Sequence, residues 1–179
     1  FKKINFKLFL SAVSVIAIAL LIVSLSGAKQ SPVENYPIRI TATTTILADL
    51  VQEIGGDHVD VSPLMGPGVD PHLYQAGAGA VSKLQDSDIV AHHGLHLEGK
   101  MGDIFRSLDK QGHRSICLED GLDPLSLLSD ENNPEVHDPH VWFNVSIWKQ
   151  AADHVAVQLA LYDPVNAADY QANLDSYLM

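Results

Sequence analysis

The sequence predicts an α/β protein, with a four-stranded parallel sheet flanked by helices. Between residues 38 and 118, short segments with strand-like alternation are separated by helical patterns in the order β-α-β-α-β-α-β. Strands that alternate with helices imply right-handed crossovers and a parallel sheet, whose ligands bind at the loops that leave the strands. The composition of the 179 residues, 46% hydrophobic and 18% charged, is that of a packed globular chain.

Each element is expected from its periodicity and from the residues at its ends. Residues 38–43 alternate apolar and polar side chains, as a half-buried strand does. Residues 46–54 place apolar side chains on one helical face, and Gly55 and Gly56 end this helix. The other strands of this region are expected at 59–64, 88–91 and 115–118, and its other helices at 78–85 and 97–108.

Two more helices are expected after a loop rich in Asp, Asn and Pro at residues 120–139. The first has an apolar face within residues 147–159. Asp163 and Pro164 then restart a helix as its N-cap and first residue. This second helix reaches residue 179 without an end signal, so we expect it to continue in a longer protein.

The N-terminus has the pattern of an export signal. Three lysines precede an apolar run over residues 8–25, and small residues follow at 26–28. We expect a signal peptide over residues 1–28, a tether over 29–37, and a location in the periplasm or at the outer face of the cytoplasmic membrane. An uncleaved anchor is the alternative, because 18 apolar residues are at the short limit of a membrane span.

The charge argues against a nucleic-acid partner. The chain has 11 Lys and Arg against 22 Asp and Glu, a formal net charge of −11. A protein that neutralises phosphates needs a clustered positive surface, which this sequence lacks. Its single cysteine, Cys117, forms neither an intrachain disulfide nor a cysteine-based zinc site. We expect a monomer.

One short motif occurs twice. Asp70-Pro71-His72 and Asp138-Pro139-His140 are each followed by an aliphatic and an aromatic residue, and their histidines are 68 positions apart. Proline fixes its own φ and keeps the preceding residue extended, so each histidine follows a stiff connection. Each motif alone could be a turn in which Asp caps the backbone. The repetition favours His72 and His140 as ligands of a borderline metal ion.

The other histidines receive weaker interpretations. His92, His93 and His96 surround Gly94 at the end of a predicted strand, and a metal site there is one alternative. Because Gly94 breaks any regular helical face, we interpret the three as surface or capping residues. His137 is either a spectator or an outer partner of the second motif. We expect no special role for the three histidines that remain.

With these residues assembled, the chain resembles the metal-binding (manganese or zinc) solute-binding proteins of ABC transporters. The matching blocks lie at residues 43–57, 63–74, 94–101 and 138–143. The resemblance implies the N-terminal lobe of a two-lobed protein over residues 38–163, the start of the inter-lobe helix over 164–179, and a second lobe outside this chain. It also implies His72 and His140 as the two metal ligands of this lobe.

Two residues depart from the family pattern. Ala28 stands where a lipoprotein signal has Cys, so no lipid anchor is expected. His93 stands where the family often has Asn.

The function implied is capture of Mn²⁺ or Zn²⁺ as a transported ligand and its delivery to the membrane permease of an ABC transporter, without enzymatic activity. The block at residues 94–101 resembles the manganese branch, but the deciding ligand belongs to the second lobe. One alternative is a secreted metallohydrolase in which Asp70 or Asp138 helps to hold a catalytic ion. Against it, the sequence offers no general base beside the motifs and no nucleophile motif. A surface adhesin with an incidental metal is the other alternative.

Overall fold

The four strands form one sheet, as predicted. The computed structural model describes residues 33, 35–129, 133 and 136–179, so the expected signal peptide and most of the tether lie outside the described residues. The strands are β1 (Ile38–Ala42), β2 (Val59–Pro63), β3 (Ile89–His92) and β4 (Arg114–Cys117). They are arranged in the order β2-β1-β3-β4, and every pair is parallel.

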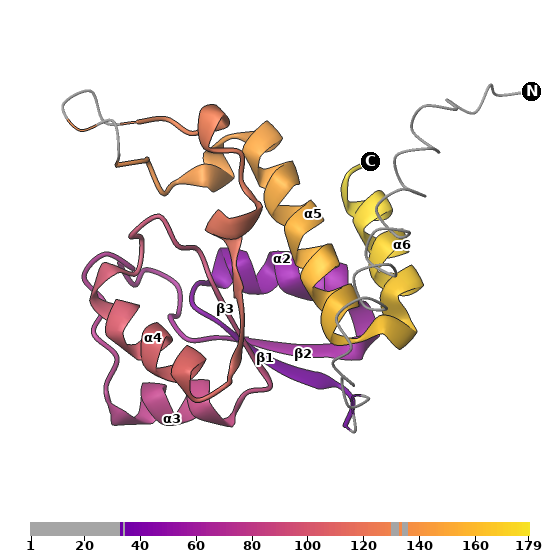
Figure 1. Cartoon of the computed structure of the whole chain (residues 1–179), viewed down its shortest axis with the longest axis horizontal. Coiled ribbons are helices and arrows are strands. Elements are labelled where there is room, and N and C mark those ends of the chain that lie inside the picture. The colour runs from indigo at the N-terminus through magenta and orange to yellow at the C-terminus, as the bar shows by residue number, and fades with distance from the viewer. Residues whose placement is uncertain (1–32, 34, 130–132, 134–135) are drawn as a thin grey trace, which may run out of the picture.

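Helices cover both faces of this sheet (Figure 1). The helices α3 (Ala78–Asp86) and α4 (Gly102–Lys110) lie on one face, and α2 (Thr45–Gly55), α5 (Val145–Tyr162) and α6 (Ala167–Tyr177) lie on the other. The predicted α/β class is therefore confirmed. In the part of the chain that the structure describes, no helix is both long and apolar enough to cross a membrane.

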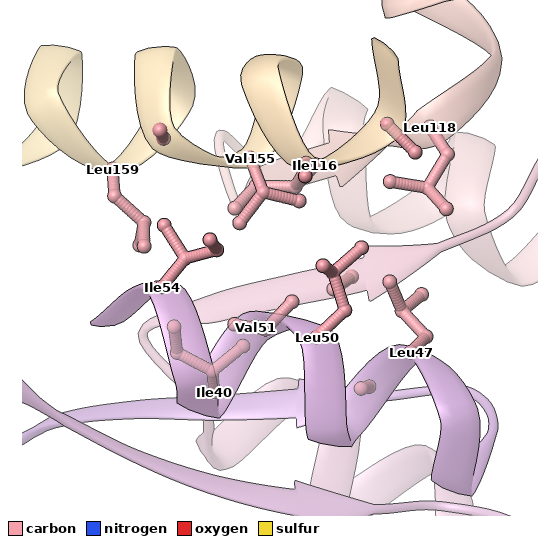
Figure 2. Close-up of a cluster of buried hydrophobic side chains, with 14 of the residues drawn as sticks. Ile40, Leu47, Leu50, Val51, Ile54, Ile116, Leu118, Val155 and Leu159 are labelled. Atoms are coloured by element: carbon pink, nitrogen blue, oxygen red, sulfur yellow. The ribbon is translucent and has the colours of Figure 1, made fainter. Parts of the chain in front are cut away.

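The larger core lies between the sheet and α2, α5 and α6. Figure 2 shows side chains of α2 facing those of α5 above the sheet. Ile54 of α2 and Val155 and Leu159 of α5 are fully buried there. Burial of one such side chain stabilises the fold by about 1.5–3 kcal/mol. A smaller core on the opposite face is formed by Leu84, Val90, Met101 and Leu108.

The helix α4 begins five residues later than the sequence predicts. The chain leaves β3 through Gly94, Leu95 and His96, whose φ angles of 76°, 50° and 59° are all left-handed. These residues precede the predicted start at residue 97, and Glu98, with φ −95° and ψ 47°, is not helical either, so no regular helix can begin there. A short 3-10 turn at Gly99–Met101 follows, and α4 starts only at Gly102.

Asp163 and Pro164 take the predicted N-cap and first positions, but of a short 3-10 turn and not of α6. A short 3-10 turn, Pro164–Asn166, precedes α6, and the Asp163 side chain does not cap it. This carboxylate is buried instead, and it accepts hydrogen bonds from Tyr36, Asn166 and Tyr170 at 2.7–2.8 Å. These hydrogen bonds connect the start of α6 to the segment that enters β1.

Candidate metal site

His72 lies in the loop that leaves the carboxyl end of β2. The amide of Met65 donates to the Thr43 carbonyl at 3.0 Å, and the Met65 side chain is buried. The loop then turns at Gly68, whose φ is +80°. Oδ1 of Asp70 accepts the amide hydrogen of His72 at 2.9 Å. The Asp-Pro-His sequence thus forms a capped turn that presents an exposed imidazole.

His140 lies immediately before the 3-10 turn Val141–Phe143 that leads into α5. Its turn repeats the first one, because Oδ1 of Asp138 accepts the amide hydrogen of His140 at 3.0 Å. The amide of Asp138 donates to the Leu128 carbonyl at 2.8 Å, and the Val141 side chain is buried. The second histidine is therefore anchored on both sides along the chain.

The structure brings the two imidazoles together. Nε2 of His72 is 3.3 Å from Nε2 of His140, and the ring centroids are 5.3 Å apart. Two neutral rings can share one hydrogen bond at this distance. The same distance also fits a shared ion, since two nitrogens at 2.0–2.1 Å from a tetrahedral zinc are about 3.3–3.4 Å apart. Both nitrogens belong to the donor type that zinc and related transition metals prefer.

Among the described residues, a carboxylate contacts the ring of His140 but not that of His72. Oδ1 of Asp138 is 2.6 Å from Nδ1 of His140, which leaves Nε2 of that ring free to face His72. The backbone amide of His140, and then its ring, lower the pKa of the Asp138 carboxyl. A carboxylate on the far nitrogen is the usual outer partner of a metal-binding histidine. The sequence motif did not reveal this contact, because Asp70 has the same spacing and reaches only the backbone.

His137 turns away from this pair. Its Nδ1 lies 3.1 Å from the Ser129 hydroxyl, and the two residues form an isolated antiparallel bridge. Of the two interpretations of His137, the spectator agrees with this contact. Asp138 is the outer partner of His140.

The interpretation of His92 and His93 as surface or capping residues is wrong, although His96 is indeed exposed. His93 is only 1% exposed, and its Nε2 lies 2.8 Å from the Thr44 hydroxyl. The ring of His92 stacks on Phe105 with centroids 4.3 Å apart. Burial lowers the pKa of His92 to about 4 and that of His93 to about 3, so both rings are neutral at pH 7.

A buried carboxylate holds the loop that carries His93. Oε1 of Glu98 accepts from the Thr43 hydroxyl at 2.5 Å and from the His93 amide at 3.0 Å. Burial raises the pKa of Glu98 above its ordinary value. Glu98 thereby connects the loop that follows β1 to the loop that follows β3.

The pair stands without a third potential ligand among the described residues. Within residues 33, 35–129, 133 and 136–179, no group of three or more His, Cys, Asp or Glu side chains is arranged to hold an ion. Apolar side chains are exposed next to the pair, including Leu73 at 65% and Phe143 at 81%. A pocket of about 380 Å³ beside His140 is lined by further apolar side chains, such as Leu128 and Val145.

Comparison with known proteins shows consistent similarity. The family model described as zinc-uptake complex component A, periplasmic (ZnuA), matches residues 40–179. The manganese-binding lipoprotein MntA of Bacillus subtilis is 40% identical over 143 residues, which are 80% of this chain and 46% of that protein. The zinc-binding protein TroA of Treponema pallidum is 36% identical over 151 residues, which are 84% of this chain and 48% of that protein.

A solved structure agrees in fold. The periplasmic zinc-binding protein TroA from Treponema pallidum superposes with a TM-score of 0.73 and 34% sequence identity. The match covers 78% of this chain and 50% of that one. The present chain therefore spans about half the length of the curated relatives that it matches.

Proposed function

Since this chain belongs to the family of the periplasmic zinc-uptake complex component A, we propose that it captures Mn²⁺ or Zn²⁺ outside the cytoplasm and delivers the ion to the permease of an ABC transporter. His72 and His140 are the proposed ligands from this part of the protein. The observation that carries the proposal is the 3.3 Å between their Nε2 atoms, with Asp138 on the far side of one ring.

The remaining ligands are proposed to come from a second lobe. Two imidazoles leave a tetrahedral ion two further positions, and a relative such as MntA is about twice as long as the matched segment. The exposed Leu73 and Phe143 beside the pair support a surface that another part of the protein covers. In this proposal, residues 38–163 form the first lobe, and residues 164–179 begin the helix between the lobes.

A binding role is favoured over catalysis. The matched relatives are named as manganese- or zinc-binding proteins. The carboxylate nearest to the pair, Asp138, is engaged by the amide and by the ring of His140, so it is poorly placed to accept a proton from a metal-bound water. Imidazole suits Zn²⁺, whereas Mn²⁺ favours carboxylate, carbonyl and water oxygens, so the choice between the two ions depends on the ligands that complete the coordination sphere.

The test is a comparison of three alanine variants in the full-length protein. Calorimetric titration with Zn²⁺ and with Mn²⁺ is expected to show a large loss of affinity for His72→Ala and for His140→Ala. His96→Ala is the matched control, because it removes an exposed imidazole from a neighbouring loop. An equal loss in all three variants contradicts the assignment, and metal-dependent turnover of ester or phosphate substrates favours the metallohydrolase.

A further inference from the structure

Three aromatic rings form a row from the interior to the proposed metal site. The indole of Trp142 lies edge to face against the imidazole of His140, with centroids 5.3 Å apart and an interplanar angle of 71°. The indole makes the same kind of contact with His93, at 5.3 Å and 68°. Edge-to-face pairs at this separation are attractive and have a preferred orientation.

The inner end of this row is held by several independent contacts. The ring of His93 meets the Thr44 hydroxyl at 2.8 Å, and the amide of His93 donates to Glu98 at 3.0 Å. The carbonyl of His93 accepts from the amide of Glu119 at 3.0 Å. With 1% exposure, this side chain has little freedom to change its rotamer.

The backbone after His93 is strained, and side chains hold it in place. Leu95 and His96 both have positive φ, a conformation that residues with a side chain rarely adopt. Oε2 of Glu119 accepts the amide hydrogen of Leu95 at 2.7 Å and so stabilises the turn. Because the chain reverses here so abruptly, the side chain of His93 is directed inward and that of His96 outward.

We propose that His93 is a positioning residue for His140: through Trp142 it restricts the imidazole of His140 to the orientation in which Nε2 faces His72. This inference rests on the proposed role of His72 and His140 as metal ligands. The Nε2 of His93 is engaged by Thr44, and its Nδ1 is buried without a hydrogen-bond partner among the described residues. With 1% of the side chain exposed, neither nitrogen is accessible to an ion, so His93 acts on the ring row and not as a ligand. A ligand that is already oriented loses less rotamer entropy when the ion binds.

The test uses Zn²⁺ alone as the probe and the full-length protein. Loss of an outer partner typically lowers metal affinity about 10 to 100-fold, and we expect about 10-fold for His93→Ala. His93→Phe keeps a ring against Trp142 and is expected to restore most of this affinity. His96→Ala is the control in the same loop and is expected to bind as the unaltered protein does.

A spectroscopic signal separates positioning from general destabilisation. Zinc binding is followed by tryptophan fluorescence, and the part of the change that Trp142→Phe abolishes is assigned to Trp142. We expect this signal to be lost in His93→Ala and kept in His93→Phe. If His93→Ala does not fold, the comparison is made between His93→Phe and Trp142→Leu, of which only the second should lose about 10-fold in affinity.

The possible outcomes distinguish this proposal from the one on which it rests. Zinc binding that survives both His72→Ala and His140→Ala overturns the proposed function and this inference together. Loss of binding in those two variants, with His93→Ala within 2-fold of His96→Ala, overturns the positioning role alone. An unchanged affinity in Trp142→Leu has the same consequence.

Discussion

Replacing each motif aspartate with asparagine tests whether the contact between Asp138 and His140 supports metal binding. Asp70 and Asp138 both accept the amide hydrogen of the histidine two residues later, at 2.9 and 3.0 Å. Only Asp138 also contacts the ring, at 2.6 Å from Nδ1. Asparagine keeps an oxygen for the amide in either turn, so Asp138→Asn removes a charge beside the ring and Asp70→Asn does not.

The size of the effect follows from the exposure of this pair. A hydrogen bond to a charged group contributes about 1.5–3 kcal/mol when it is well buried. The Asp138 and His140 side chains are 49% and 40% exposed, so solvent screening reduces the contribution to about 1 kcal/mol. A change of 1 kcal/mol corresponds to about 5-fold in affinity. We therefore expect Asp138→Asn to weaken zinc binding about 5 to 10-fold, and Asp70→Asn to weaken it less than about 2-fold.

The assay is a competition for zinc between the full-length protein and a chromophoric chelator at pH 7.5. The contacts with His140 lower the pKa of Asp138, so the carboxylate is charged at this pH. Its contribution is present above the ordinary pKa of an aspartate and is lost as the pH falls through the lowered value. Equal affinities of the two asparagine variants, or a larger loss in Asp70→Asn, would refute the role given to the ring contact.

Three further predictions concern stability. His92 and His93 have pKa values of about 4 and 3 in the fold and about 6.5 in the unfolded chain, so between these values the unfolded chain binds up to two more protons. As the pH drops from 6 to 4.5, the free energy of unfolding should therefore fall by up to about 2.7 kcal/mol per pH unit. Urea titrations should show a shallower dependence for His93→Asn. Glu98→Ala leaves a buried hydroxyl and amide without their acceptor and should cost about 2–4 kcal/mol, and a cost below 1 kcal/mol contradicts the network. Tyr170→Phe removes one of three donors to the buried Asp163 and should cost about 1.5–3 kcal/mol by the same titration, whereas an unchanged midpoint speaks against that cluster.

The parts of the fold that the sequence predicts well are those with local causes. The pattern of short apolar segments between helical ones predicts the four strands to within one position at each end, and Gly56, with a φ of 57°, ends α2 where expected. The pairing of His72 with His140 also has a local signal in the repeated Asp-Pro-His. Parallel strands place the loops at their carboxyl ends along one edge, and this edge is where the two motifs meet.

The parts that the sequence does not predict depend on contacts between distant loops. The burial of His93 requires Thr44 from the loop after β1 and a left-handed turn at Leu95, and no spacing pattern announces either. Asp163 fits the pattern of an N-cap, but its carboxylate turns inward because Tyr36, far along the chain, supplies a donor. In each case tertiary hydrogen bonds override the local preference of the segment.

Identical motifs acquire different environments because of the elements that follow them. After His140 the chain enters a 3-10 turn with the buried Val141 and continues into α5, so this turn is fixed to the core. After His72 comes Leu73, which is 65% exposed, and the chain meets the smaller core only at Tyr74 and Ala76. His140 is the sole hydrogen-bonding partner that the described residues offer to the His72 ring. Ordering an exposed, rotamer-rich side chain costs about 0.5–1.5 kcal/mol, and in the proposed site this cost falls on His72. If the two histidines act as the proposed ligands, His140 is already oriented by Asp138 and by the turn fixed to the core, and His72 is the one that has to adjust.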